Sequence, residues 1–261
     1  MFDPTRRFSA RVADYVAHRP GYPRECAETL AQEFSLKPAS IVADIGCGPG
    51  NLAIRFLELG HHVISIEPND EMRTAGEALL APWSTFRAVA GRAEATTLPD
   101  VSVDAVVVGQ AFHWFDQSAT RSEFARILRP GGPVGLYWNN RRLDSSAFLS
   151  GYETLLRRLC PEYVKISGEY ANEQKIAVFF GPSGYRRWRF DNVQHFDWDG
   201  LLGRTRSASY VPREGPAVAA LTTELRRLFD STSREGRVAF EYDTLLFAGR
   251  LAGEFRVASS K

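Results

Sequence analysis

The sequence predicts an α/β fold, in which a doubly wound and mostly parallel sheet carries helices on both faces. Two observations support this prediction. In the first half of the chain, short apolar runs typical of buried strands alternate with amphipathic helical segments over short connections. The first of these runs also ends in a glycine-rich turn at residues 46–50, where sheets of this class place their ligands.

Strands and helices alternate regularly in this first half. The run at residues 103–108 is the most hydrophobic of the chain, so we expect it near the centre of the sheet. The expected strands are residues 40–45, 62–67, 86–90, 103–108 and 134–138, and the expected helices are residues 52–59, 71–80 and 117–128.

The second half follows a different pattern. Asp144 is placed to cap a helix whose apolar residues keep helical spacing until Pro161. A further helix is expected at 216–229, with strands at 187–191 and 242–248. We expect one domain over residues 1–261, made of an N-terminal arm and helix (1–36), a core (37–140), a helical cap insertion (141–185) and a C-terminal sheet edge (186–261).

The composition excludes several classes of protein. The 261 residues carry 32 Lys and Arg against 31 Asp and Glu, a formal net charge of +1. Nucleic-acid binders usually show a basic excess, because neutralising phosphates supplies much of their affinity. Cys26, Cys47 and Cys160 are too few and too far apart for a disulfide framework or a structural zinc site. No apolar run fits a signal peptide or a bilayer span, so we expect a cytoplasmic protein without nucleic-acid, membrane or metal partners.

The glycine turn indicates a nucleotide-like ligand. Residues 44–50 read Asp-Ile-Gly-Cys-Gly-Pro-Gly, and glycines let the backbone turn sharply and approach a ligand without a Cβ in the way. Glu67 ends the second expected strand, 21 residues after Gly46, where a carboxylate can accept hydrogen bonds from both hydroxyls of a ribose. A dinucleotide and an adenosyl cofactor both satisfy this spacing.

Two positions in the turn separate these ligands. The dinucleotide pattern G-x-G-x-x-G requires a third glycine at residue 51, which is Asn51 here. Pro49 also removes one N–H group that a pyrophosphate would need. The turn therefore favours an adenosyl compound over NAD.

Residues 44–50 resemble the first motif of class I S-adenosylmethionine-dependent methyltransferases. The resemblance continues through Glu67, Ala93-Glu94, residues 103–106 and residues 124–132, and covers roughly residues 8–140. The segments at 15–23 and 110–115 further resemble a small-molecule branch, the methyltransferase type 11 proteins that are similar to trans-aconitate methyltransferase. The resemblance implies a Rossmann-like sheet of seven strands with an N-terminal arm and a helical cap.

The resemblance also implies which residues bind S-adenosylmethionine. The glycines would meet its methionine part, Asp44 its ammonium group, Glu67 its ribose and Glu94 its adenine, while the N-terminal arm would close over it. The residues implied in cofactor binding are Asp44, Gly46, Cys47, Gly48, Gly50, Glu67, Pro68, Ala93, Glu94, Gln110, Tyr15, Arg19 and Tyr22.

The acceptor site is less sharply defined. His113 lies near where the methyl group would project and is a candidate general base, although it can equally pack between its aromatic neighbours. Trp114, Asn139 and Arg141 are candidate substrate residues. The fourth strand is not followed by the Asn/Asp-Pro-Pro-Tyr pattern of many N-methyltransferases, so we expect a small-molecule acceptor that reacts through an oxygen or a carboxylate. The alternatives are a non-catalytic adenosyl-binding protein and, less favoured, an NAD-dependent oxidoreductase; either a monomer or a homodimer fits.

Overall fold

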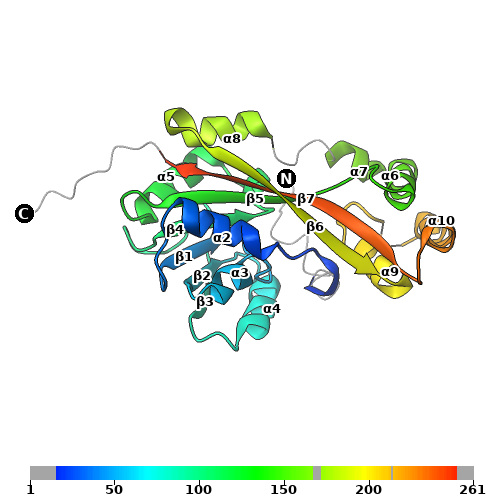
Figure 1. Cartoon of the computed structure of the whole chain (residues 1–261), viewed down its shortest axis with the longest axis horizontal. Helices are drawn as coiled ribbons and strands as arrows, with labels where there is room; N and C mark the ends of the chain where they lie inside the picture. The colour runs from blue at the N-terminus through cyan, green and yellow to red at the C-terminus, as the bar shows by residue number, and fades with distance from the viewer. Residues whose placement is uncertain (1–15, 167–171, 213, 252–261) are drawn as a thin grey trace, which may run out of the picture. The chain divides into compact units, whose positions relative to one another are not determined.

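The computed structural model describes residues 16–166, 172–212 and 214–251 (Figure 1). The strands in these residues are β1 (Ile41–Ile45), β2 (His62–Ile66), β3 (Phe86–Val89), β4 (Ala105–Gly109), β5 (Pro133–Arg141), β6 (Arg186–Phe196) and β7 (Val238–Arg250). The helices are α2 (Arg24–Glu33), α3 (Ala53–Glu58), α4 (Asp70–Leu80), α5 (Gln117–Ile127), α6 (Ala147–Leu159), α7 (Pro161–Ile166), α8 (Glu173–Phe180), α9 (Trp198–Arg206) and α10 (Pro216–Thr232), with short 3-10 helices η3 (Phe112–Trp114) and η4 (Gly181–Ser183).

Within the described residues, the strands form one seven-stranded sheet in the order β3-β2-β1-β4-β5-β7-β6. β1 is parallel to β2 on one side and to β4 on the other, and the pairs β2–β3 and β4–β5 are also parallel. The predicted α/β fold with a mostly parallel sheet is confirmed. The strand order changes direction beside β1, so the carboxyl ends of β1 and β4 form the switch point at which such sheets bind ligands.

The run that the sequence places at the centre supplies β4, the fourth strand of the order. Its residues from Ala105 to Val108 are buried, as expected for a strand covered on both faces. The strand begins two residues later than predicted, because Val103 forms an isolated bridge with Leu128 at the end of α5. Small differences of this kind are usual at element ends.

The chain divides into two compact units, each with its own core. The larger unit contains the described residues 22–138, 172–189 and 245–251, and the smaller unit contains 16–21, 139–166, 190–212 and 214–244. The core of the larger unit is formed by the parallel strands, α5 and α8. The core of the smaller unit is formed by α6, α9, α10 and the first half of β7.

Helix α8 belongs to the larger unit, although the sequence groups its residues with the cap insertion. It lies against α5, where the Arg121 side chain donates a hydrogen bond to the Phe179 carbonyl at 2.9 Å. The Phe179 ring also meets Phe112 with 4.8 Å between ring centroids. Of the segment at 141–185, the described residues 141–166 are therefore part of the smaller unit, and residues 172–185 are part of the larger unit.

The smaller unit is built around the packing of α6 against α10. Gly151 of α6 lets the helices approach, because a Cβ there would clash with the Leu228 side chain. The prediction that Asp144 caps α6 is wrong: the helix begins at Ala147, and the Ser146 hydroxyl accepts the Leu149 amide hydrogen bond at 3.2 Å. Serine at this position satisfies an amide that the first helical turn leaves unpaired.

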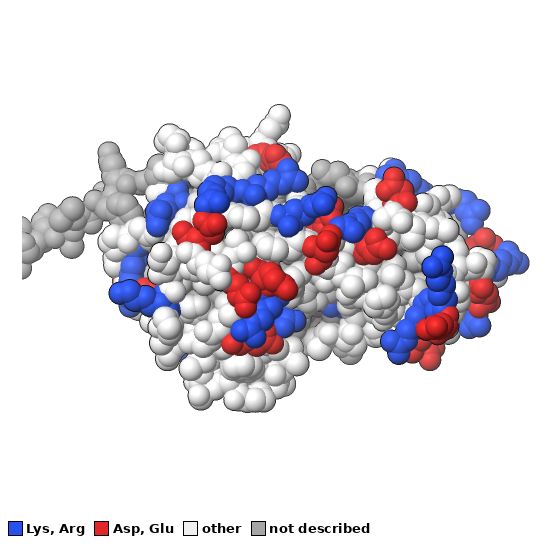
Figure 2. Space-filling model, viewed as in Figure 1, with Lys and Arg blue, Asp and Glu red and all other residues white. Residues whose placement is uncertain are grey.

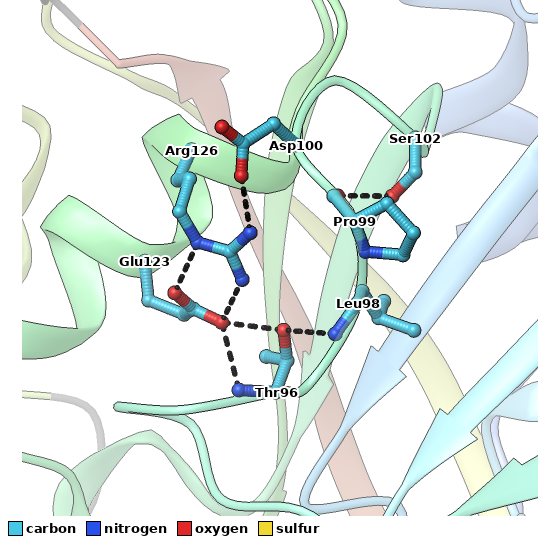
Figure 3. A network of polar contacts seen from close by, with 7 residues as sticks. All are labelled: Thr96, Leu98, Pro99, Asp100, Ser102, Glu123 and Arg126. Carbon is cyan, nitrogen blue, oxygen red and sulfur yellow. Dashed lines mark hydrogen bonds and ion pairs between the residues drawn. The ribbon is translucent and has the colours of Figure 1, made fainter.

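A buried polar network fixes the loop that follows β3 (Figure 3). The Glu123 carboxylate on α5 accepts hydrogen bonds from the Thr96 amide at 2.7 Å and from its hydroxyl at 2.5 Å. Arg126 binds the same carboxylate at 2.7 Å and reaches Asp100 at 2.5 Å. Although burial acts in the opposite sense, the bonds from Arg126 and Thr96 lower the pKa of Glu123 to about 2. An ionised carboxylate therefore anchors this loop to α5.

Acidic and basic side chains are interspersed on the face of the molecule shown in Figure 2, in keeping with the net charge of +1. None of the described helices combines the length and the apolar character needed to cross a membrane.

Candidate active site

The glycine turn follows β1 and leads into α3, and all three of its glycines have positive φ angles: 65° at Gly46, 55° at Gly48 and 90° at Gly50. An added Cβ at Gly46 would lie 2.8 Å from the Ala111 Cβ, and one at Gly50 would lie 2.6 Å from the Leu80 side chain. An added Cβ at Gly48 would meet nothing within 4 Å. Two of the glycines therefore permit close packing, and the third faces open space.

Asp44, at the end of β1, is a fully buried carboxylate. Neither of its oxygens has a hydrogen-bond partner among the described residues. Burial raises the pKa of Asp44 to about 8; the Ala53 amide acts against this rise without reaching hydrogen-bond geometry, and the Glu67 charge adds to it. Buried polar groups in native proteins are normally paired, so an unpaired carboxylate beside the glycine turn marks a place for a hydrogen-bond donor from outside the chain.

Glu67 follows β2 and connects two loops. One carboxylate oxygen accepts from the Gly48 amide at 2.9 Å, and the other accepts from the Asn69 amide at 3.0 Å. Burial raises the pKa of Glu67, and these two amides oppose the rise. A carboxylate has about four acceptor positions, so two remain for further donors such as the hydroxyls of a ribose. Pro68 is the next residue, half-buried beside this contact.

The Ala93-Glu94 pair lies in the loop after β3. Ala93 is buried, and the Glu94 carboxylate accepts a hydrogen bond from the Asp116 amide at 3.0 Å. Asp116 in turn caps α5 through its own side chain. Glu94 therefore joins the loop after β3 to the loop after β4, while its second oxygen lies 3.9 Å from Arg92.

The turn after β4 is backbone-strained. Gln110 has a φ of 57°, a conformation that is unfavourable for residues other than glycine and is concentrated at functional sites. Gly109, just before it, lies against the Tyr22 side chain, since an added Cβ would come within 2.8 Å of the Tyr22 hydroxyl. Ala111, just after it, contacts Gly46 as described above.

His113 lies in η3, with its ring 4.7 Å from the Trp114 ring between centroids. Burial, with a smaller contribution from the positive charge of Lys175, lowers the pKa of His113 to about 4. The imidazole is therefore in its neutral form at physiological pH, and the same burial makes it a weaker base than an exposed histidine. Trp114 is 39% exposed, which is unusual for so large an aromatic side chain.

These contacts bring together the loops after four neighbouring strands. Gly46 touches Ala111, Gly48 binds Glu67, and Glu94 binds the residue that caps α5. The arrangement holds an unpaired carboxylate, an open glycine and two acidic side chains at one edge of the sheet. The part of the chain that the structure describes contains no group of three or more His, Cys, Asp or Glu residues that could hold a metal ion.

Comparison with known proteins decides the family. A methyltransferase-like protein of Schizosaccharomyces pombe is 35% identical to this chain over 187 residues, which cover 71% of this chain and 69% of that protein. The chain belongs to the class I S-adenosylmethionine-dependent methyltransferases. Its residues 43–135 match the family described as methyltransferase domain, the stretch that contains the glycine turn and the loops after β2, β3 and β4.

Other similar proteins carry the same description. An uncharacterized methyltransferase of Mycobacterium tuberculosis is 40% identical over 139 residues, or 53% of this chain and 54% of that protein. The match thus spans about half the length of such relatives. A solved structure, described as a type II methyltransferase from Anaeromyxobacter dehalogenans, aligns with a TM-score of 0.66 over 91% of this chain and 100% of that chain, at 22% identity. It supports the fold.

The remaining predicted residues of this methyltransferase fall elsewhere. Tyr15 lies outside the described residues. Arg19 is in the smaller unit, where it donates to the Ser207 carbonyl at 3.1 Å. Asn139 is buried in the same unit and bonds to the Gly21 carbonyl at 3.1 Å and to the side chain of Asn192 at 3.2 Å.

Arg141 and its neighbour Arg142 differ in how fully they are paired. Arg142 binds the carboxylates of Asp191, Asp243 and Glu241. Arg141 has a single carboxylate partner, Glu153, at 2.6 Å. Of the two arginines that follow the apolar part of β5, Arg141 is therefore the one with bonding capacity left.

Sequence reasoning missed residues that act through packing. Ala111 is small where Gly46 needs space, and Gly76 of α4 packs on the turn, since an added Cβ would lie 3.3 Å from the Pro49 backbone. Asn69 supplies one of the two amides that bind Glu67. A short side chain at residue 111 is a weak signal in a single sequence, whereas the Asn69 side chain that caps α4 is recognisable as a helix start.

Proposed function

We propose that this methyltransferase transfers the methyl group of S-adenosylmethionine to an oxygen of a small-molecule acceptor. The observation that carries the proposal is Asp44: a fully buried carboxylate without a partner among the described residues, next to a glycine turn that is open at Gly48. The cofactor's ammonium group is the kind of donor that Asp44 lacks. An adenosyl cofactor therefore fits the residues present.

Each loop would hold a different part of the cofactor. Asp44 would accept from the ammonium group, and a charge-assisted bond of this kind is stronger than a neutral one. Glu67 would use its two remaining acceptor positions for the ribose hydroxyls. Glu94 would accept from the adenine amine, and the backbone beside Ala93 would donate to a ring nitrogen. When bound, S-adenosylmethionine supplies a methyl group on positively charged sulfur, which is displaced in line by the acceptor oxygen.

The protein's own contribution is alignment and, for a hydroxyl acceptor, removal of a proton. His113 is neutral at physiological pH because burial lowers its pKa to about 4. It would take the proton of the acceptor hydroxyl as the oxygen attacks, which leaves the methylated oxygen neutral and the imidazole charged. A carboxylate acceptor is already ionised and needs no base.

A melting experiment with two ligands tests the cofactor. At a hundred times its dissociation constant a ligand stabilises the native state by about 2.7 kcal/mol, a rise in Tm of roughly 5 to 10 °C for a chain of this size. We expect S-adenosylhomocysteine to produce this rise and NAD to produce none. A rise with NAD alone would support an oxidoreductase, and no rise with either ligand would refute the proposal.

Transfer itself is tested by incubation with methyl-labelled S-adenosylmethionine and a panel of small hydroxy acids, carboxylic acids and amines. We expect label in the hydroxy or carboxylic acids. Binding of S-adenosylhomocysteine without transfer to any member of the panel would favour the non-catalytic alternative. We further propose that the protein acts in the cytoplasm as a monomer or homodimer, with no nucleic-acid or membrane partner; the interspersed surface charges support a small-molecule partner.

A further inference from the structure

The smaller unit contains a second cluster of buried polar side chains, separate from the residues proposed to bind the cofactor. Two arginines form its centre, Arg141 on β5 and Arg204 on α9. Two aromatic rings connect them: the Arg141 guanidinium lies 5.0 Å from the centre of the Tyr152 ring, and that ring lies 5.0 Å from the Phe240 ring, which Arg204 contacts. The cluster is enclosed by aromatic rings, because the core of this unit is rich in tyrosine and phenylalanine.

Arg141 is only partly paired. One of its terminal nitrogens, Nη2, donates to the Glu153 carboxylate at 2.6 Å and to the Tyr163 hydroxyl at 3.1 Å. Its guanidinium also lies 5.0 Å from the centre of the Tyr152 ring. The other terminal nitrogen, Nη1, is buried and has no hydrogen-bond partner among the described residues.

Arg204 has still fewer partners. It is 6% exposed, and its Nε donates to the Tyr242 hydroxyl at 3.3 Å while the guanidinium lies 5.5 Å from the centre of the Phe240 ring. Its Nη1 is also buried without a partner, and it forms no ion pair with any carboxylate that the structure describes. Its guanidinium thus meets two neutral aromatic side chains, Tyr242 and Phe240.

The charges of the cluster do not balance. Glu153 is the acidic residue bound there, and its second oxygen is occupied by the exposed Arg157 at 2.6 Å. Among the residues that the structure describes, Glu153 is the carboxylate that binds Arg141, and Arg204 is left as a buried positive charge without a carboxylate partner. An arginine cannot escape this by losing its proton. Burying an uncompensated charge costs several kcal/mol in general, and such groups are retained where they serve binding or catalysis.

We propose that Arg141 and Arg204 bind a carboxylate group of a small molecule. Each arginine offers an Nη1 without a partner among the described residues, and a planar carboxylate matches the forked geometry of guanidinium donors. A single negative charge balances the excess of one positive charge, whereas a phosphate dianion exceeds it. This carboxylate site lies within the smaller unit and goes beyond the proposed function, on which it does not rest.

Arg204→Met is the informative variant. Methionine has a similar length and no charge, and replacement of an uncompensated buried charge by an apolar side chain of similar volume is often neutral or stabilising. We expect the variant to melt at or above the temperature of the wild type without ligand. We expect it also to bind carboxylates more weakly than the wild type does. An arginine with a merely structural role would give the opposite result, a lower Tm.

Binding is measured by calorimetry on the full chain without cofactor, with succinate, citrate and benzoate at up to about 10 mM, which covers the weak affinities expected of a single anchoring group. Dimethyl succinate is the neutral control and inorganic phosphate the alternative anion. We expect at least one carboxylate to bind, and Arg204→Met and Arg141→Gln to weaken it by about 10- to 100-fold. Arg227→Met, an exposed arginine on α10, is the matched control and should bind as the wild type does.

Absence of binding by all three carboxylates would overturn the proposal. So would equal binding by wild type and Arg204→Met, or tighter binding of phosphate than of any carboxylate. If Arg204→Met does not fold, Arg141→Gln decides the question in the same titration. S-adenosylhomocysteine is titrated in parallel: its failure to bind refutes the proposed function alone, because the carboxylate titration contains no cofactor.

Discussion

Replacement of Asp44 by asparagine isolates the most unusual group of the proposed cofactor site. The wild-type carboxylate is fully buried and unpaired among the described residues, and burial raises its pKa from 3.8 to about 8. The folded protein therefore holds a proton on Asp44 more tightly than the unfolded chain does. By linkage, the free energy of unfolding is largest below pH 4 and falls as the pH rises from about 4 to about 8.

The size of this effect follows from the shift. Each pKa unit corresponds to about 1.4 kcal/mol. The shift of about four units therefore lowers the free energy of unfolding by at most about 6 kcal/mol at pH 8 and above, and by about 4 kcal/mol at pH 7. Asparagine does not titrate and does not contribute this loss. The asparagine amide is itself buried and lacks a partner, and this lowers the free energy of unfolding of the variant by about 1 to 3 kcal/mol at every pH. The stability difference between Asp44→Asn and wild type should therefore grow with pH, by up to about 1.4 kcal/mol per pH unit.

Urea unfolding at several pH values between 5 and 8 measures this slope, with the exposed Asp230→Asn as control. Titration of S-adenosylhomocysteine at the same pH values gives the second measurement. We expect wild-type affinity to increase with pH, because the ligand's ammonium group binds the ionised carboxylate. Asp44→Asn should bind about 10- to 100-fold more weakly, with little dependence on pH. A constant stability difference from pH 5 to 8, or unchanged affinity in the variant, would refute the reasoning.

Three further changes test other parts of the larger unit. Gly46→Ala should lower the free energy of unfolding by about 2 to 3 kcal/mol in urea denaturation, because its φ is positive and its Cβ would meet Ala111 at 2.8 Å. Gly60 also has a positive φ, of 82°, but open space surrounds it. Gly60→Ala should therefore lower the free energy of unfolding by only about 1 kcal/mol. Glu123 has a pKa lowered to about 2, so the free energy of unfolding of the wild type should decline as the pH falls from about 4.5 towards 2. Glu123→Gln should lack this decline in an acid titration, and at pH 7 it should be about 2 kcal/mol less stable than the wild type. His113→Ala should lower kcat by about 100-fold on a hydroxyl acceptor and leave S-adenosylhomocysteine affinity unchanged; equal kcat values would make His113 a packing residue.

The fold and the cofactor loops could be predicted because their signals are local. Strands buried on both faces are continuous apolar runs, and a glycine turn with an acid at the end of the next strand is readable from spacing alone. Asp44 and Glu67 lie where the sequence places them, at the ends of β1 and β2. The bonds from Gly48 and Asn69 that occupy half of the Glu67 carboxylate could not be predicted, because they depend on how two loops meet in space.

The arginine cluster shows where sequence reasoning ends. Arg141 is a candidate because it follows a predicted strand, whereas Arg204 is one of two arginines in the last turn of α9 and resembles a solvated residue in the sequence. Only packing buries it beside Phe240. Likewise Asp144 and Ser146 are both good helix caps by residue type, and the choice of Ser146 depends on where the chain leaves β5.

The two bonds of the Glu67 carboxylate have a consequence for the thermodynamics of cofactor binding. Because Glu67 holds the Gly48 amide and the Asn69 amide at once, both loops are ordered when the chain folds and need not be ordered again by a ligand. Preorganisation of this kind reduces the entropy lost on association. We therefore expect little unfavourable conformational entropy on binding, and slow hydrogen exchange at the Gly48 amide in the ligand-free protein as its signature. The affinity would then be set by the few acceptor positions that these loops leave unoccupied.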